Sequence, residues 1–351
     1  MNHDLFLQQL LDTFSVYLVG KCSDQELGLG SDETLRVFIP DLHWMSRECL
    51  TRYTGGYSFN GKTLMGLLLP LLENTQVFQL GDRFDLWREA TSDDENILTV
   101  YDRIKNDPDI KALSIELDNL TSHYCRGNHD TWLKQVEELR PTMKASQEKI
   151  VTGNDSKIQV LHGHQFDTLE IPPAPFKADM VRLAPGIKSS TYDIGIFPNE
   201  LVKEIQSKLD LCKDDYDIYP RVTPPGAKLL TSIEDIAIIE EGSKTYLDVS
   251  IFPRGGNNDP GNYFEHISYL SFADQILGYD QVDNQFSIHV IGHGHQARLL
   301  LDYLPNGAPH LTVDCGGWIE NCTIQGQTPL PSAQIGVQYK NDVRIYQLAG
   351  K

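Results

Sequence analysis

The stretch Gly127-Asn128-His129-Asp130 follows a short run, 122–126, that is predicted to form a β-strand. On its own it would be an ordinary polar loop, since Asn tolerates the left-handed backbone of many turns. Four other motifs rich in Asp and His stand before and after it, and the five motifs together hold six of the 11 histidines. The four are Asp41-Leu42-His43, Gly81-Asp82-Arg83-Phe84-Asp85, His162-Gly163-His164 and Gly292-His293-Gly294-His295. This clustering favours one shared site over five unrelated loops.

Each motif follows a run that is predicted to be a strand, and helical patterns separate several of these strands. Side chains on the loops after the strands of an α/β sheet face a common cleft. The alternation predicts an α/β sandwich. The expected strands are 35–39, 76–80, 122–126, 157–161, 286–291, 297–304, 310–313, 335–339 and 343–348, the last two forming a hairpin. The expected helices are 63–72, kinked or ended by Pro70, then 96–105 and 132–149.

The two remaining regions differ from this alternation. The amino-terminal segment is predicted to be a helix whose apolar stripe consists of Leu7, Leu10, Leu11, Phe14 and Leu18. Between 165 and 285, prolines, glycines and an acidic run interrupt the pattern. We expect 1–351 to form a single domain, in which 165–285 is an insert that precedes the final His-x-His motif and caps the cleft.

Composition narrows the class of protein. The 351 residues are 40% hydrophobic, enough for an ordinary core, and no apolar run approaches the roughly 20 residues of a membrane-spanning helix. The net charge of -19 disfavours nonspecific binding to nucleic acid, which uses a basic face. It still admits a small phosphorylated substrate, because bound cations add local positive charge. Six scattered cysteines suit reduced thiols in a cytoplasmic protein, and the oligomeric state cannot be deduced.

The residue types suit the hydrolysis of a phosphate ester. Such esters react slowly because their negative charge repels a nucleophile and the leaving oxygen departs with charge. Two cations about 3.5 to 4 Å apart turn a shared water into hydroxide and neutralise the charge that builds during in-line attack on phosphorus. Their ligands are carboxylates, imidazoles and an amide oxygen. The spacings Asp-x-His and His-x-His place two such ligands on the same side of an extended segment.

Each motif also has an ordinary explanation. A lone Asp-x-His is more often a solvated pair than a ligand, and a Gly-Asp after a strand is commonly a turn. His162 after an apolar run is compatible with a hydrogen-bonded core histidine. All five ordinary explanations would have to hold together, with the motifs in ligand order, so the joint pattern favours a site.

The five motifs resemble the calcineurin-like metallophosphoesterases, whose pattern is Asp-x-His, Gly-Asp-x-x-Asp, Gly-Asn-His-Asp or Glu, a His-Gly or Gly-His, and Gly-His-x-His. The resemblance covers 35–318 without the insert, and it implies an α/β fold in which a sandwich of two mixed β-sheets is flanked by helices. It implies that Asp82 bridges two divalent metal ions. One would be held by Asp41, His43, Asp82 and His295, and the other by Asp82, Asn128, His162 and His293. Mn²⁺ is the first expectation, and Fe, Zn²⁺ or Mg²⁺ also suit ligands without thiolate.

The resemblance also implies roles for residues outside the ligand set. His129 would lie over the cleft, stabilise developing charge and protonate the leaving oxygen, with Asp130 orienting its ring. Asp85 would support the site by hydrogen bonds. His164 stands where some relatives carry Asp, which leaves the choice between His162 and His164 open, and His162 is preferred because it immediately follows a strand.

Two further departures concern neighbours of the ligands. Pro40 stands where such proteins often have a small residue, and Arg83 places a basic side chain beside the expected bridging carboxylate. The stretch 81–87 is more similar to the branch containing the UDP-2,3-diacylglucosamine diphosphatases than to the protein phosphatases.

Two alternatives remain open. The stretch Gly56 to Thr63 fits the nucleotide-binding pattern G-x-x-x-x-G-K-[ST], but no predicted strand precedes it as a phosphate-cradling loop requires. A non-catalytic binding protein on the same fold is the other alternative. It would be expected to have lost ligands, whereas here the set and His129 are intact.

Overall fold

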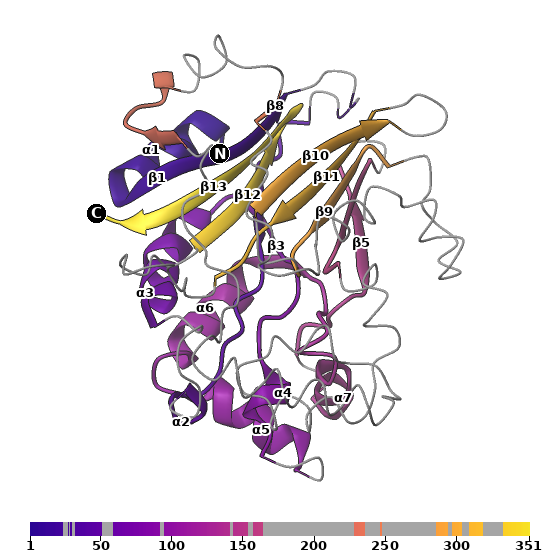
Figure 1. Ribbon diagram of the computed structural model, residues 1–351. Coiled ribbons are helices and arrows are strands. Elements are labelled where there is room, and N and C mark those ends of the chain that lie inside the picture. The colour runs from indigo at the N-terminus through magenta and orange to yellow at the C-terminus, as the bar shows by residue number, and fades with distance from the viewer. Residues whose placement is uncertain are drawn as a thin grey trace, which may run out of the picture.

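The structure is a computed structural model in which two mixed β-sheets lie beside a group of helices (Figure 1). This arrangement confirms the predicted α/β fold class. The described residues are 1–23, 27, 29, 32–50, 59–91, 95–140, 143–153, 157–163, 228–235, 246–247, 286–293, 297–303, 309–318 and 333–351.

The first sheet contains eight of the described strands. Strands β2, β3 and β4 are parallel, so the loops after them leave from the same edge. The two ends of the chain meet in this sheet, because β1 pairs antiparallel with β13. The order is β4 (Thr121–Tyr124), β3 (Gln76–Gln79), β2 (Arg36–Ile39), β12 (Ala333–Tyr339), β13 (Asp342–Gly350), β1 (Phe14–Ser23) and β7 (Lys228–Leu230), with β8 (Tyr246–Leu247) also paired to β1.

The second sheet contains five described strands. Its three central strands are parallel, and its two outer strands run antiparallel to their neighbours. The order is β10 (Ala297–Tyr303), β11 (Pro309–Cys315), β9 (Ile288–Ile291), β6 (Ile158–Leu161) and β5 (Lys149–Thr152). The loops after β6 and β9 therefore also share one edge.

Helices pack on one face of the first sheet, and the second sheet packs on the other. Within β2, Val37 and Ile39 join a core that includes helical residues such as Leu68, whereas Phe38 joins a core with Val160 of the second sheet. This is the two-residue periodicity of a strand buried on both faces. The helices are α1 (His3–Thr13), α2 (Arg47–Leu50), α3 (Phe59–Leu68), the 3₁₀ helix η2 (Leu69–Leu72), α4 (Leu86–Glu89), α5 (Ile97–Lys105), α6 (Lys111–Leu120) and α7 (Leu133–Leu139).

Most expected elements are confirmed, including the helix over 96–105 and the hairpin of β12 and β13. The effect expected of Pro70 is also confirmed, because α3 ends at Leu68 and Pro70 lies in the first turn of η2. A proline lacks the N–H that would continue an α-helix.

Two expectations about helices were wrong, and one helix was not predicted. The amino-terminal helix ends at Thr13, and the next ten residues form β1. They include Val16, Tyr17 and Val19, which favour strands because branched and aromatic side chains pack well on a pleated surface. The helix expected over 132–149 ends at Leu139, and Lys149 begins β5. Helix α6 was not expected at all.

Most of the predicted insert, 165–285, lies outside the described residues. Two short described pieces of it, β7 and β8, extend the first sheet at β1. Its function as a cap stays a prediction. Within the described part of the chain, none of the helices has both the length and the apolar character of a membrane span.

Candidate metal centre

The loops that carry the motifs of both sheets meet at one place. Residues 40–43, 80–85 and 125–130 follow β2, β3 and β4, and residues 162–163 and 292–293 follow β6 and β9. Within the first sheet, the backbone N–H of His43 donates to the Asp82 carbonyl at 2.7 Å. Within the second, the N–H of Gly292 donates to the His162 carbonyl at 2.9 Å. Side-chain contacts of His162 with Asp82 and Asn128 join the loops of the two sheets.

Three predicted ligands gather around an imidazole nitrogen of a fourth, His162. Nε2 of His162 lies 2.9 Å from Asn128 Oδ1, 3.2 Å from Asp82 Oδ2 and 3.2 Å from His293 Nδ1. All four side chains are buried. Nδ1 of His162 lies 2.8 Å from the carbonyl of Leu80 and donates to it, which directs Nε2 towards the other three. Holding the second nitrogen of a histidine in this way is typical of metal ligands.

His43 and Asp41, which were predicted to hold the other metal, each contact a different member of the first group. Nε2 of His43 lies 3.5 Å from Asp82 Oδ2, and Asp41 Oδ1 lies 3.6 Å from His162 Nδ1. Nδ1 of His43 lies 3.1 Å from Asp85 Oδ2, so this imidazole also presents Nε2 to the shared carboxylate. His295 and His164 lie outside the described residues, and their roles stay predictions. Of the two candidates after β6, His162 is the one whose placement is described.

The backbone is unusual at three of the predicted ligands. His43, Asp82 and His293 have φ angles of 44°, 46° and 58°, and they are three of the five non-glycine residues with positive φ among the described residues. Residues other than glycine rarely adopt this backbone conformation, and such strain concentrates at functional sites. The strained turns direct these side chains towards one another.

Two motif glycines leave room for carboxylates. A Cβ atom at Gly127 would overlap Asp82 Oδ1, and a Cβ atom at Gly292 would overlap Asp41 Oδ1. Both carboxylates belong to the predicted ligand set. The glycines therefore have a steric function, which explains their place in the motifs.

The hydrogen bonds of His129 correct one predicted role. Nδ1 of His129 lies 3.0 Å from Asp85 Oδ1, so the residue that orients this ring is Asp85. Asp130, to which that role was assigned, accepts the N–H of Gly127 at 2.6 Å and the hydroxyl of Tyr124. It therefore stabilises the loop of its own motif and, by accepting the N–H of Arg83 at 3.0 Å, joins that loop to the one after β3. The expectation that Asp85 supports the site by hydrogen bonds agrees with this geometry.

Tyr124 and Trp318 are site residues that the sequence analysis missed. Tyr124 lies on β4 and donates its hydroxyl to Asp130, and the backbone N–H of Trp318 donates to the Asp41 carbonyl at 2.8 Å. Tyr124 lies six residues before Asp130, so a polar aromatic on the strand before the motif was the available signal. Nothing in the sequence pattern relates Trp318 to Asp41.

The pKa values of three buried predicted ligands reflect the crowding of charged groups. Burial disfavours the imidazolium of His162, but the carboxylates of Asp82 and Asp41 outweigh it and raise the pKa of His162 to about 10. Burial also raises the pKa of Asp41 to about 6. For Asp82, burial opposes ionisation, but the imidazoles of His162 and His129 hold its pKa well below the usual value. Such shifts are typical of sites in which a ligand balances the charge.

The donor set fits divalent metal ions. One nitrogen or oxygen from each of His43, Asp82 and His129 lies within 4.8 Å of the others, and the same holds for Asp82, His162 and His293. Asp82 belongs to both groups, as a bridging ligand must. In addition, the amide nitrogen of Asn128 is buried without a hydrogen-bond partner among the described residues. A buried donor left unpaired is costly, so this N–H₂ group needs an acceptor such as a water or a phosphate oxygen, which a cation alone does not supply.

The nucleotide-binding pattern lies partly outside the described residues. Residues 59–63 form the start of α3, and the preceding residues of the pattern are not described. That alternative stays a prediction from the sequence.

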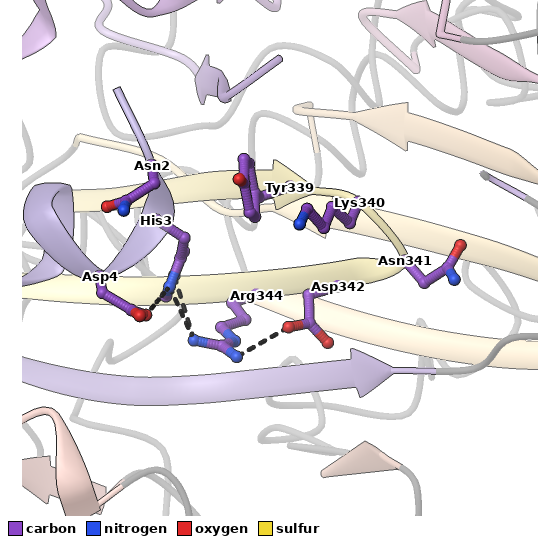
Figure 2. Close-up of a pocket in the computed structure, with 8 residues that line it drawn as sticks. All are labelled: Asn2, His3, Asp4, Tyr339, Lys340, Asn341, Asp342 and Arg344. Carbon is purple, nitrogen blue, oxygen red and sulfur yellow. Dashed lines mark hydrogen bonds and ion pairs between the residues drawn. The ribbon is translucent and has the colours of Figure 1, made fainter. Parts of the chain in front are cut away.

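A separate cavity of about 460 Å³ lies where the β12–β13 turn meets the start of α1 (Figure 2). This turn lies beside the beginning of β2, because Gln338 pairs with Arg36, whereas the ligands follow the end of β2. The charges that line the cavity are paired locally: Arg344 contacts Asp342 at 2.9 Å and His3 at 3.1 Å. The cavity is thus remote from the metal centre.

No protein-family model and no curated protein matches the sequence. Among solved structures, the chain is similar to a dimetal phosphatase from Danio rerio, with 12% identity and a TM-score of 0.34 over 88% of this chain and 96% of that chain. A similarity of this degree says nothing about the activity of this chain.

Proposed function

We propose that the protein hydrolyses phosphate esters with the help of two divalent metal ions. The observation that carries this proposal is the convergence of Asp82, Asn128 and His293 on Nε2 of His162, with Asp82 also facing His43. Carboxylate, imidazole and amide donors of this kind are suited to Mn²⁺, Fe, Zn²⁺ or Mg²⁺, with Mn²⁺ our first choice.

Each predicted ligand would have a defined place. Asp41, His43 and His295 would hold one ion, and Asn128, His162 and His293 the other, with Asp82 shared. When bound, the two ions activate water and neutralise charge on the phosphoryl group. The chain keeps the ligands pointing inwards through Asp85 and the Leu80 carbonyl, which hold the Nδ1 atoms of His43 and His162.

His129 would act on the substrate directly. Burial lowers the pKa of His129 to about 4, although Asp85 and Asp82 act in the opposite direction. The ring is therefore neutral near pH 7 in the absence of substrate. A phosphoryl group beside it would raise the pKa again, because a nearby negative charge favours the charged imidazolium. In that state Nε2 can stabilise the developing charge and protonate the leaving oxygen, while Nδ1 donates to Asp85.

The substrate would be a small phosphorylated molecule. The sequence is similar over 81–87 to the UDP-2,3-diacylglucosamine diphosphatase branch, so a diphosphate linked to a nucleoside belongs in the first test set, beside monoesters and diesters. A non-catalytic binding protein on the same fold is the second candidate. Intact ligand geometry around Asp82 favours the enzyme.

Purified protein supplied with Mn²⁺ should hydrolyse bis-p-nitrophenyl phosphate or p-nitrophenyl phosphate. Asp82→Ala should abolish both metal binding and hydrolysis. His129→Ala should leave two bound ions per chain and reduce turnover by about 10²- to 10⁴-fold, the usual contribution of a positioned acid. If the wild-type protein binds metal but is inactive on a broad panel of phosphate esters, the binding protein becomes the better account. If His129→Ala loses a metal, His129 is a ligand instead.

A further inference from the structure

Arg83 does not point its guanidinium at the cleft, although it follows the shared carboxylate directly. The side chain is only 3% exposed and runs to helix α6. There it donates to the carbonyl and the hydroxyl of Ser114 at 2.8 and 2.7 Å, and it forms an ion pair with Asp118. Its guanidinium carbon also lies 4.8 Å from the centre of the Phe84 ring, within the range of a cation–π contact. A side chain held in this way has no freedom to reach a substrate.

The backbone of Asp82 and Arg83 connects the other ligand loops. The Asp82 carbonyl accepts the N–H groups of Leu42 and His43, and the Arg83 carbonyl accepts the N–H of Trp44 at 2.8 Å. These bonds hold the loop that carries His43.

The same segment also holds the loop after β4. The N–H of Arg83 donates to Asp130 Oδ2 at 3.0 Å, and the carboxylate of Asp82 accepts the N–H of His129 at 2.8 Å. Two residues therefore set the relative positions of three ligand loops. One of the two, Asp82, has a strained φ of 46°.

Building on the proposed function, we infer that Arg83 is a positioning residue of the metal centre. Its side chain fastens the segment 82–83 to helix α6, so that the Asp82 carboxylate faces both metal positions despite the strain in its backbone. Arginine suits this task because one guanidinium nitrogen donates to the carbonyl and the hydroxyl of Ser114 while another reaches Asp118, whereas a lysine at this position would offer a single nitrogen.

Lys105 provides a matched control. It lies on α5, and its ammonium group contacts the same two side chains, Ser114 Oγ at 2.6 Å and Asp118. Its backbone belongs to helix α5 and not to a ligand loop, although its ammonium group also lies 5.9 Å from the centre of the Phe84 ring. Loss of Lys105 should therefore disturb the same acceptors without releasing the segment 82–83.

The test compares Mn²⁺ binding by the wild-type chain, Arg83→Lys and Lys105→Met. Calorimetry should show the dissociation constant of Arg83→Lys raised by about 10- to 100-fold, the usual effect of losing a residue that supports a metal ligand. Electron paramagnetic resonance should show isolated Mn²⁺ in this variant in place of the coupled pair of the wild type. Lys105→Met should keep wild-type affinity and the coupled signal. Urea unfolding of the metal-free variants measures their stability separately.

Equal affinity and equal coupling in Arg83→Lys and the wild type would overturn the inference. The same affinity loss in Lys105→Met would overturn it too, because the effect would then come from α6 alone. If Arg83→Lys does not fold, Asp118→Ala takes its place, since Asp118 is 40% exposed and its loss removes one acceptor of Arg83. Asp118→Ala should then weaken Mn²⁺ binding, and unchanged binding would refute the role. A wild-type chain that binds none of Mn²⁺, Fe²⁺, Zn²⁺ or Mg²⁺ would instead refute the proposed function itself.

Discussion

The Nδ1 atom of His129 lies 3.0 Å from a carboxylate oxygen of Asp85, and the other oxygen of that carboxylate lies 3.1 Å from Nδ1 of His43. One buried side chain thus orients both the residue proposed to act on the leaving group and a proposed metal ligand. The rings of His43 and His129 meet edge to face, with centres 4.7 Å apart. Their positions therefore depend on the same support.

Asp85→Asn should impair both histidines at once. The amide keeps the size of the carboxylate but can accept only one of the two Nδ1–H bonds. We expect phosphate-ester hydrolysis with saturating Mn²⁺ to fall by about 10- to 100-fold, as for other residues that support metal ligands. Kinetics across a Mn²⁺ series would measure this. Asp4→Asn, at an exposed position on α1, is the control. Activity of Asp85→Asn equal to that of the control would contradict the shared-support role.

Gly127→Ala should damage the metal centre by steric overlap. The added methyl group would collide with Asp82 Oδ1, whereas at Gly350 it would meet nothing within 4 Å. We expect Gly127→Ala to lose Mn²⁺ affinity and about 1 to 3 kcal/mol of stability, the usual cost of overpacking. Gly350→Ala should match the wild type in calorimetry and urea unfolding. Wild-type Mn²⁺ binding by Gly127→Ala would show that Asp82 can move without consequence.

Metal binding should release protons. In the metal-free chain the pKa of His162 is raised to about 10, so near pH 7.5 its ring holds a proton that coordination must remove. Apparent Mn²⁺ affinity should therefore increase with pH until the pH passes that value. Calorimetry in two buffers of different ionisation enthalpy would count about one released proton from this residue. Proton-neutral binding with a flat pH profile would show that His162 holds no proton to release near pH 7.5.

His3 should make the fold sensitive to acid. Burial, followed by the charge of Arg344, lowers the pKa of His3 to about 4. Between about pH 6.5, the usual value for an unfolded chain, and about pH 4, the unfolded chain binds a proton that the folded chain does not. The free energy of unfolding should therefore decline as the pH falls through this window, by on the order of 3 kcal/mol. Urea unfolding of metal-free wild type and His3→Gln would isolate the effect, because only the wild type should show this part of the decline. Parallel pH profiles of unfolding for the wild type and His3→Gln would contradict this effect of His3.

Local patterns predicted the strands that carry the ligands, since the apolar runs before Asp41, Asp82 and His162 form β2, β3 and β6. They were less reliable for the ends of helices. Residues 14–23 carry apolar side chains that suit a helix stripe, but pairing with β13 places them in a sheet. The competition between helix and strand was decided by a partner more than 300 residues away in the chain.

The residue types and order of the five motifs, by themselves, determined that this chain carries carboxylates, imidazoles and an amide on loops after strands, the chemistry of a metal site. Only the tertiary structure decided that Asp85 orients His129, that Asp130 stabilises its own loop, and that Arg83 points to α6. These choices depend on distances of about 3 Å between groups on different loops, since a hydrogen bond acts only at such range. No local pattern specifies them, because they follow from how strands distant in sequence pack together.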